Sequence, residues 1–98
     1  MGKLVRDLIP QIAEKSGSSN QFGLIESDEH YRKALLDKLV EEAIEVRESN
    51  GDAEEIADVL EVLDAILIEF DLRMSDIAFL QAGKRQERGG FSEGRYML

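Results

Sequence analysis

The chain has 98 residues, a length typical of one domain with a small core. Its 43% hydrophobic content excludes a disordered chain, and its formal net charge of −9 disfavours nonspecific binding to the phosphate backbone of duplex DNA. A nucleotide ligand is not excluded, because a metal ion can bring phosphate to an acidic site. The chain has no cysteine for disulfides or thiol chemistry. It shows neither a signal-peptide pattern nor an apolar run long enough to span a membrane, so we expect a cytoplasmic protein.

Helical periodicity dominates the sequence and predicts an all-α fold in a single domain over residues 1–98. A short helix is expected to begin near Asp7, with Pro10 tolerated in its first turn. Residues 17–27 are rich in turn formers and predict a loop. Three longer helices are predicted over residues 28–49, 53–70 and 76–88. We expect Ser27 to cap the N-terminus of the first and Ser75 that of the third.

Two acidic clusters lie on the two consecutive longer helices, on either side of a predicted turn at residues 49–52. Helices joined by so short a connection usually form an antiparallel hairpin. The hairpin would bring Glu42 and Glu45 to face Glu55 and Asp58. Four converging carboxylates need a counter-charge, and hard divalent cations prefer oxygen ligands. The spacing therefore predicts a magnesium site.

The helical wheel makes Glu42 the most informative residue of the chain. At 100° per residue, Leu35, Leu39 and Val46 lie within about 40° of one another and mark a buried stripe. Glu42 falls inside this stripe, and Glu45 lies at its edge. A carboxylate in a leucine stripe is unfavourable unless it is paired, hydrogen-bonded or bound to a metal.

The second long helix is apolar on more than one face. Glu55 and Asp58 lie on a flank that is apolar enough to be partly buried, together with Val62 and Ile66. In so short a chain, such a helix is either central or covered by another subunit, so we predict a homo-oligomer, a dimer or a tetramer. Five residues form its main apolar stripe: Ile56, Leu60, Leu63, Leu67 and Phe70.

Each carboxylate also has a simpler explanation. Glu42 could be a buried glutamate paired with Arg32 or Lys38, and Glu55 could complete a capping box with Asp52. Acidic residues at helical spacing commonly lie on solvated faces. That explanation is preferred for two of them, Glu41 and Glu54.

Three motifs together resemble the MazG-like all-α nucleoside triphosphate pyrophosphohydrolases, a family related to phosphoribosyl-ATP pyrophosphohydrolases and dimeric dUTPases. The motifs are Lys3–Pro10, the acidic pair Glu41–Glu45 and Glu55–Asp58, and Lys84–Phe91, so that the resemblance covers nearly the whole chain. It implies a helical bundle around an antiparallel hairpin. It also implies Mg²⁺-dependent cleavage of a nucleotide between its α- and β-phosphates, which gives a monophosphate and pyrophosphate. Mn²⁺ would be able to substitute. Many members of the family act as house-cleaning enzymes on non-standard nucleotides.

The resemblance also implies roles for individual residues. Glu41 would be an auxiliary carboxylate or base, acting beside Glu42 and Glu45 in catalysis. Four residues would be metal ligands: Glu42, Glu45, Glu55 and Asp58. Four basic residues would contact phosphate: Lys3, Arg6, Lys84 and Arg88.

Simpler roles remain for the basic residues, as solvated charges near the N-terminus or as partners of a helix dipole at residues 84–88. Two other functions also remain open. One is phosphoribosyl-ATP pyrophosphohydrolase activity, and the other is a helical interaction module without catalysis.

Overall fold

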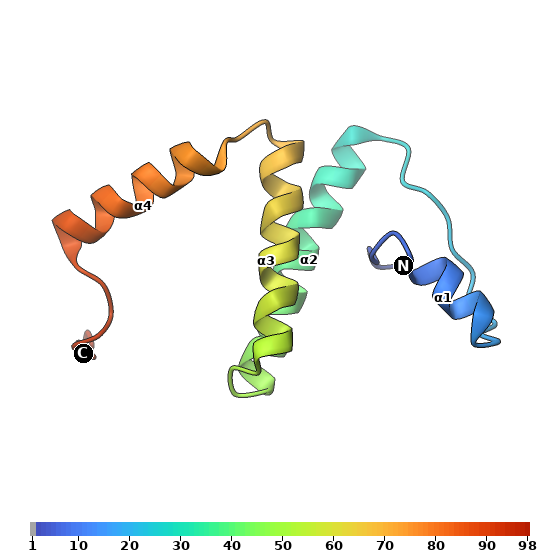
Figure 1. Ribbon diagram of the computed structural model, residues 1–98, viewed down its shortest axis with the longest axis horizontal. Coiled ribbons are helices and arrows are strands. Elements are labelled where there is room, and N and C mark those ends of the chain that lie inside the picture. The colour runs from blue at the N-terminus through green and yellow to red at the C-terminus, as the bar shows by residue number, and fades with distance from the viewer. Residues whose placement is uncertain (1) are drawn as a thin grey trace. The chain divides into compact units, whose positions relative to one another are not determined.

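The computed structural model describes residues 2–98, and its regular structure there consists of helices alone (Figure 1). This confirms the all-α prediction. The chain divides into two compact units, Met1–Ile66 and Leu67–Leu98, and the single domain stays a prediction. No helix in the described range is long and apolar enough to cross a membrane. The helices are α1 (Ile9–Lys15), α2 (Asp28–Glu48), α3 (Ala53–Glu69) and α4 (Met74–Arg88).

The helix starts follow local chemistry at two of three expected positions. Pro10 lies in the first turn of α1, where its missing N–H is harmless. Ser27 caps α2, with its Oγ accepting the backbone N–H of His30 at 3.3 Å. Ser75 is not the cap of the last helix, because α4 begins at Met74 with an extended Arg73 before it. The carbonyl of Arg73 accepts the backbone N–H of Ile77 at 3.1 Å, which draws Ser75 into the first turn.

The helix ends show how the sequence stops each helix. After α2, Asn50 takes a left-handed conformation with φ 59°, and the N–H of Gly51 bonds to the Val46 carbonyl at 2.9 Å. Asparagine tolerates this conformation better than most residues, and the bond satisfies a carbonyl that the helix leaves unpaired. The same arrangement ends α3 at Asp71, with φ 54°, and α1 at Gly17, with φ 79°.

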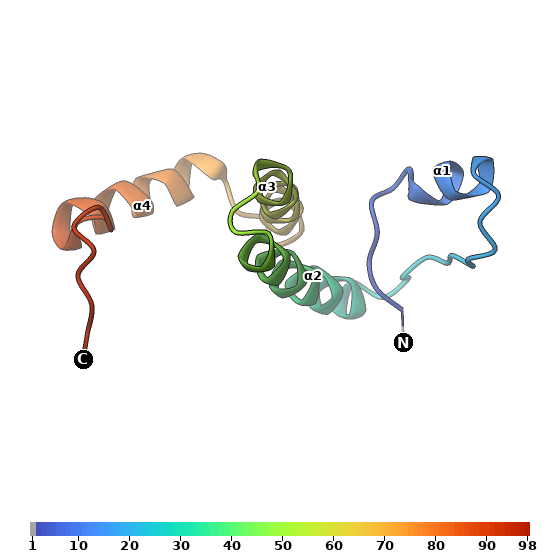
Figure 2. The same ribbon diagram turned by 90° about the horizontal axis from the view of Figure 1, so that it is seen from below.

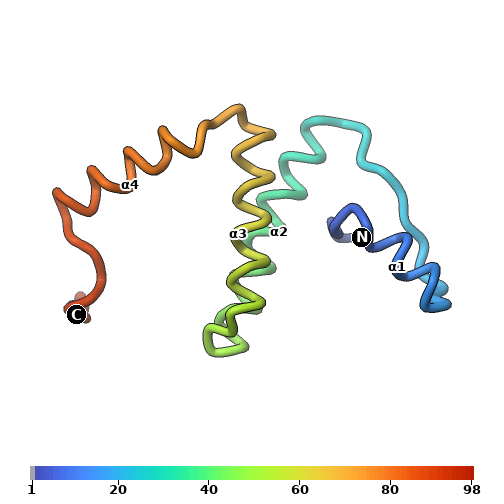
Figure 3. The backbone as a smooth tube through the Cα atoms, viewed as in Figure 1, coloured from blue at the N-terminus to red at the C-terminus, as the bar shows by residue number. Residues whose placement is uncertain are grey.

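Helices α2 and α3 lie side by side in two perpendicular views (Figures 1 and 2). The backbone trace reverses between them at residues 49–52 (Figure 3). Within residues 2–98 the buried side chains are Leu35, 2% exposed, and Glu42, 7% exposed, both on α2. On α3, four half-buried residues recur at helical spacing, Glu55, Asp58, Val62 and Ile66.

Of the two apolar faces predicted for α3, the flank is half-buried, and the main stripe is exposed at every residue except Leu67. Ile56, Leu60 and Leu63 are 43%, 58% and 37% exposed. The reason is geometric: the inner face of α3 carries the acidic residues, so its stronger apolar stripe points away from the small core of this unit. A second exposed stripe runs along α2 through Leu36, Val40 and Ile44.

Candidate functional site

Three of the predicted metal-binding carboxylates converge where α2 ends and α3 begins. Glu42, Glu45 and Glu55 each offer an oxygen atom, and these oxygens lie within 4.8 Å of one another. The short reversal at residues 49–52 brings the last turns of α2 against the first turns of α3. The spacing in sequence therefore becomes proximity in space for these three residues, which we call the carboxylate trio.

Glu42 is the buried member of the trio. Its Oε1 lies 3.3 Å from the Lys38 Nζ, an ion pair in which both side chains are largely buried. Its Oε2 is buried and has no hydrogen-bond partner. The simpler explanation, a glutamate paired with Lys38, thus accounts for one oxygen and leaves the other unexplained. An unpaired buried acceptor is unfavourable, so this atom points to a partner outside the chain's own donors.

The neighbouring carboxylates favour the protonated form of Glu55. A hydrogen bond with Glu45, burial, and the charges of Glu45, Asp58 and Glu42 raise the pKa of Glu55 above its usual value of 4.5. When Glu45 and Glu55 are both ionised, neither carboxylate has a proton to donate to the other. The buried Oε2 of Glu55 has no hydrogen-bond partner. The site therefore favours any cation, whether a proton or a metal ion, that neutralises the trio.

Glu55 does not complete a capping box in this structure. A capping box would direct the backbone N–H of Asp52 to the Glu55 carboxylate. That N–H instead donates to the Ser49 Oγ at 3.1 Å. The Glu55 side chain is left to the carboxylate trio.

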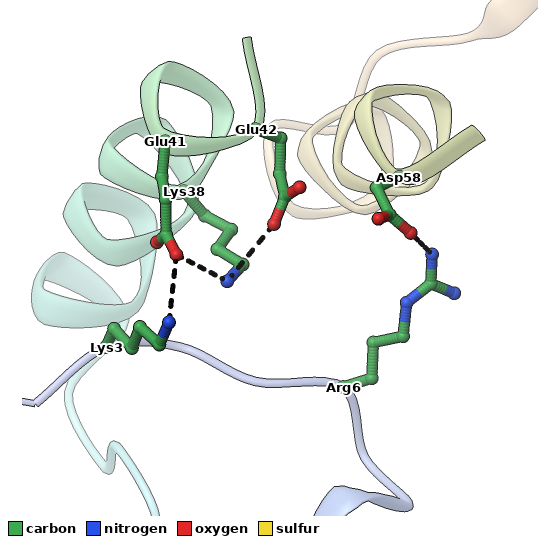
Figure 4. Close-up of polar contacts among 6 residues, drawn as sticks. All are labelled: Lys3, Arg6, Lys38, Glu41, Glu42 and Asp58. Carbon is green, nitrogen blue, oxygen red and sulfur yellow. Dashed lines mark hydrogen bonds and ion pairs between the residues drawn. The ribbon is translucent and has the colours of Figure 1, made fainter. Parts of the chain in front are cut away.

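Two lysines hold Glu41 beside the trio (Figure 4). Its Oε1 lies 3.2 Å from Lys3 Nζ and 3.3 Å from Lys38 Nζ. Burial alone would raise the pKa of Glu41, but the hydrogen bonds and charges of Lys3 and Lys38 outweigh it, so that the pKa is lowered. Glu41 is therefore ionised at neutral pH, and it is not the purely solvated residue that spacing favoured.

Asp58, the fourth predicted metal ligand, is not part of the trio. Its Oδ1 lies 2.6 Å from Arg6 Nη2, in an ion pair that reaches from the N-terminal segment to α3 (Figure 4). The predicted phosphate contacts Arg6 and Lys3 thus lie next to the acidic residues. Neither is simply solvated, since each pairs with a carboxylate of a different helix.

A cavity of about 650 Å³ opens between the N-terminal segment, α1 and the α2–α3 pair. Tyr31 is its aromatic residue, and eight lining residues are aliphatic. The other seven are charged: Lys3, Arg6, Asp7, Lys38, Glu42, Asp58 and Glu61. Its volume falls in the range of small-molecule sites, and charged residues of both signs make its lining more polar than is usual for such sites.

Two predicted site residues belong to the second unit. Lys84 and Arg88 are exposed on α4, in the second unit, and their role as phosphate contacts stays a prediction. Conversely, the sequence predicts Lys38 only as a counter-ion of Glu42, whereas in the structure it bridges Glu41 and Glu42. Its spacing of three and four residues from the two glutamates was the pattern that could have identified this role.

Comparison of the chain with models of known protein families, with curated protein sequences and with solved structures found no match.

Proposed function

We propose that this protein is a Mg²⁺-dependent nucleotide pyrophosphohydrolase that cleaves a nucleoside triphosphate between its α- and β-phosphates. The observation that carries the proposal is Glu42, a buried carboxylate with an unpartnered oxygen among two further carboxylates. The reaction proposed for this site comes from the resemblance to MazG-like enzymes. A house-cleaning role on non-standard nucleotides in the cytoplasm is part of the same proposal.

The residues fit a hard divalent cation. Glu42, Glu45 and Glu55 would hold it, with Asp58 as a fourth ligand, and all four offer the oxygen atoms that Mg²⁺ and Mn²⁺ prefer. The unpartnered oxygens of Glu42 and Glu55 would find a partner there. When bound, the ion supplies charge neutralisation for the triphosphate and activation of water.

The protein's own side chains would bind and orient the substrate. Arg6 and Lys3 stand at the rim of the acidic residues, where they can hold phosphate oxygens. The apolar part of the cavity has room for a nucleoside, with Tyr31 available to stack on the base. Glu41, kept ionised by two lysines, is suited to accept a hydrogen bond from the attacking water.

A second copy of the chain would complete the fold. In residues 2–98, Leu35 is the only apolar side chain that is buried, and two exposed apolar stripes run along α2 and α3. Soluble monomers rarely expose continuous apolar patches of this kind. We propose that the α2–α3 pair is the central hairpin of a MazG-like helical bundle, closed by stripe-to-stripe packing in a homodimer or homotetramer.

The test of the activity is pyrophosphate release from a panel of standard and modified nucleoside triphosphates, with Mg²⁺ and with chelator. Release should require Mg²⁺, and Glu42→Gln should reduce it to the level seen with chelator. Glu48→Gln is the matched control, because it makes the same change at an exposed position of the same helix. Release that survives in Glu42→Gln would refute the proposed site.

The same assay separates the two other functions. Activity on phosphoribosyl-ATP with none on the triphosphates would assign the chain to that related reaction. If the protein shows no activity and binds no Mg²⁺, the results favour a helical interaction module. The exposed stripes of α2 and α3 would then be its interaction surfaces.

A further inference from the structure

The N-terminal segment bridges the two helices that carry the acidic residues. Arg6 Nη2 lies 2.6 Å from Asp58 Oδ1 on α3, and Lys3 Nζ lies 3.2 Å from Glu41 Oε1 on α2 (Figure 4). The two basic residues are three positions apart on one segment. They therefore neutralise carboxylates of both helices at once.

Of these two contacts, the one made by Arg6 involves a proposed metal ligand. Asp58 stands outside the carboxylate trio, and its oxygen is held by a short, charge-assisted hydrogen bond. A cation that binds Asp58 through Oδ1 meets the positive charge of the guanidinium group at the same atom, and the two positive charges repel each other. Arg6 and the metal ion are thus competitors for one atom.

We propose that Arg6 exchanges between two anionic partners, Asp58 and the phosphate chain of the substrate. This inference rests on the proposed function and adds to it an order of events at the site. When a divalent cation takes Asp58 Oδ1, Arg6 is released and pairs with the phosphates that the cation brings. Metal and phosphate then bind with positive coupling, because either ligand breaks the Arg6–Asp58 ion pair and so frees the group that the other ligand binds.

The properties of Arg6 suit this exchange. The planar guanidinium group matches the geometry of both carboxylate and phosphate. Its side chain is 55% exposed and lines the cavity, so that it can move toward a ligand without unpacking a core. Lys38, by contrast, is fixed in α2 between Glu41 and Glu42, with a side chain only 15% exposed.

The first measurement is the binding of Mn²⁺ alone to the purified full chain, followed by electron paramagnetic resonance. Arg6→Gln should bind Mn²⁺ about two- to fivefold more tightly than wild type, the factor expected from an exposed ion pair. Lys33→Gln is the matched control, because it removes the same charge from an exposed pair with Asp37 outside the site. It should leave Mn²⁺ affinity unchanged.

The second measurement is the binding of inorganic tripolyphosphate in saturating Mg²⁺, by calorimetry. Arg6→Gln should bind this probe at least about tenfold more weakly, because a charge-assisted hydrogen bond is lost. Arg6→Lys keeps the charge but not the planar pair of donors, so its affinity for tripolyphosphate should lie between those of wild type and Arg6→Gln. Circular dichroism of each variant checks that its helices are intact.

Opposite signs in the two measurements distinguish exchange from other roles. If Arg6 only braced the N-terminal segment, Arg6→Gln would weaken both ligands, which would overturn the inference. Equal Mn²⁺ affinity in wild type and Arg6→Gln, or unchanged tripolyphosphate affinity, would also overturn it while leaving the proposed metal site standing. Wild-type protein that binds no Mn²⁺ would overturn the metal site as well, and with it the proposed function.

Discussion

Replacing Glu42 with glutamine separates the two explanations of its burial, because the amide keeps the shape of the side chain and removes its charge. In the wild-type protein, Oε1 is 3.3 Å from Lys38 Nζ and Oε2 has no partner. A buried acceptor without a partner costs about 1–3 kcal/mol, whereas loss of the ion pair costs only about 0–1 kcal/mol, because Lys38 keeps Glu41 as its second partner. The amide N–H can also donate to the carboxylate of Glu45 or Glu55. In chelator, Glu42→Gln should therefore be more stable than wild type by about 1–2 kcal/mol.

Mg²⁺ should reverse this order. A ligand at 100 times its Kd stabilises the folded state by about 2.7 kcal/mol, and Glu42→Gln should lose most of that gain. The assay is thermal unfolding followed by circular dichroism, at one protein concentration, with Mg²⁺ and with chelator. For a chain of this length, 1 kcal/mol corresponds to about 4–8 °C in Tm, so both differences are measurable.

One result would refute this reasoning. If Glu42→Gln is less stable than wild type by the same amount in both conditions, Glu42 is a structural partner of Lys38 and not a metal ligand. Glu48→Gln, with its side chain exposed, should show no Mg²⁺-dependent reversal.

Three further predictions test the surroundings of the site. Lys38→Gln should lower the free energy of unfolding by about 2 kcal/mol, between the values for exposed and buried pairs, and Glu42→Gln in the same chain should recover part of this loss. Because the pKa of Glu55 is raised, its contribution to stability is present below pH 4.5 and is lost as pH rises through its folded-state pKa. In chelator, the Tm advantage of Glu55→Gln over wild type should therefore grow between about pH 4 and pH 7, and a constant difference would contradict the shift. Leu60→Asp should convert the proposed homo-oligomer to a monomer in light scattering, whereas Leu24→Asp, in a loop and 93% exposed, should not.

The sequence by itself determined the local structure of this protein. Ser27 supplies a side-chain acceptor at the start of α2, and Asn50 and Gly51 tolerate the left-handed backbone that ends it. These are interactions between residues close in sequence, so their chemistry can be predicted without knowledge of the fold. The helical spacing of Glu42 with Leu35 likewise predicted that a carboxylate would be buried.

Only the tertiary structure decided which charges meet. Glu45 and Glu55 join Glu42, whereas Asp58 is drawn to Arg6, 52 positions away in sequence. It also decided which face of α3 is half-buried, because that depends on how the helix is rotated against α2. Periodicity gives the faces of a helix, but their partners are chosen by the packing of the whole unit.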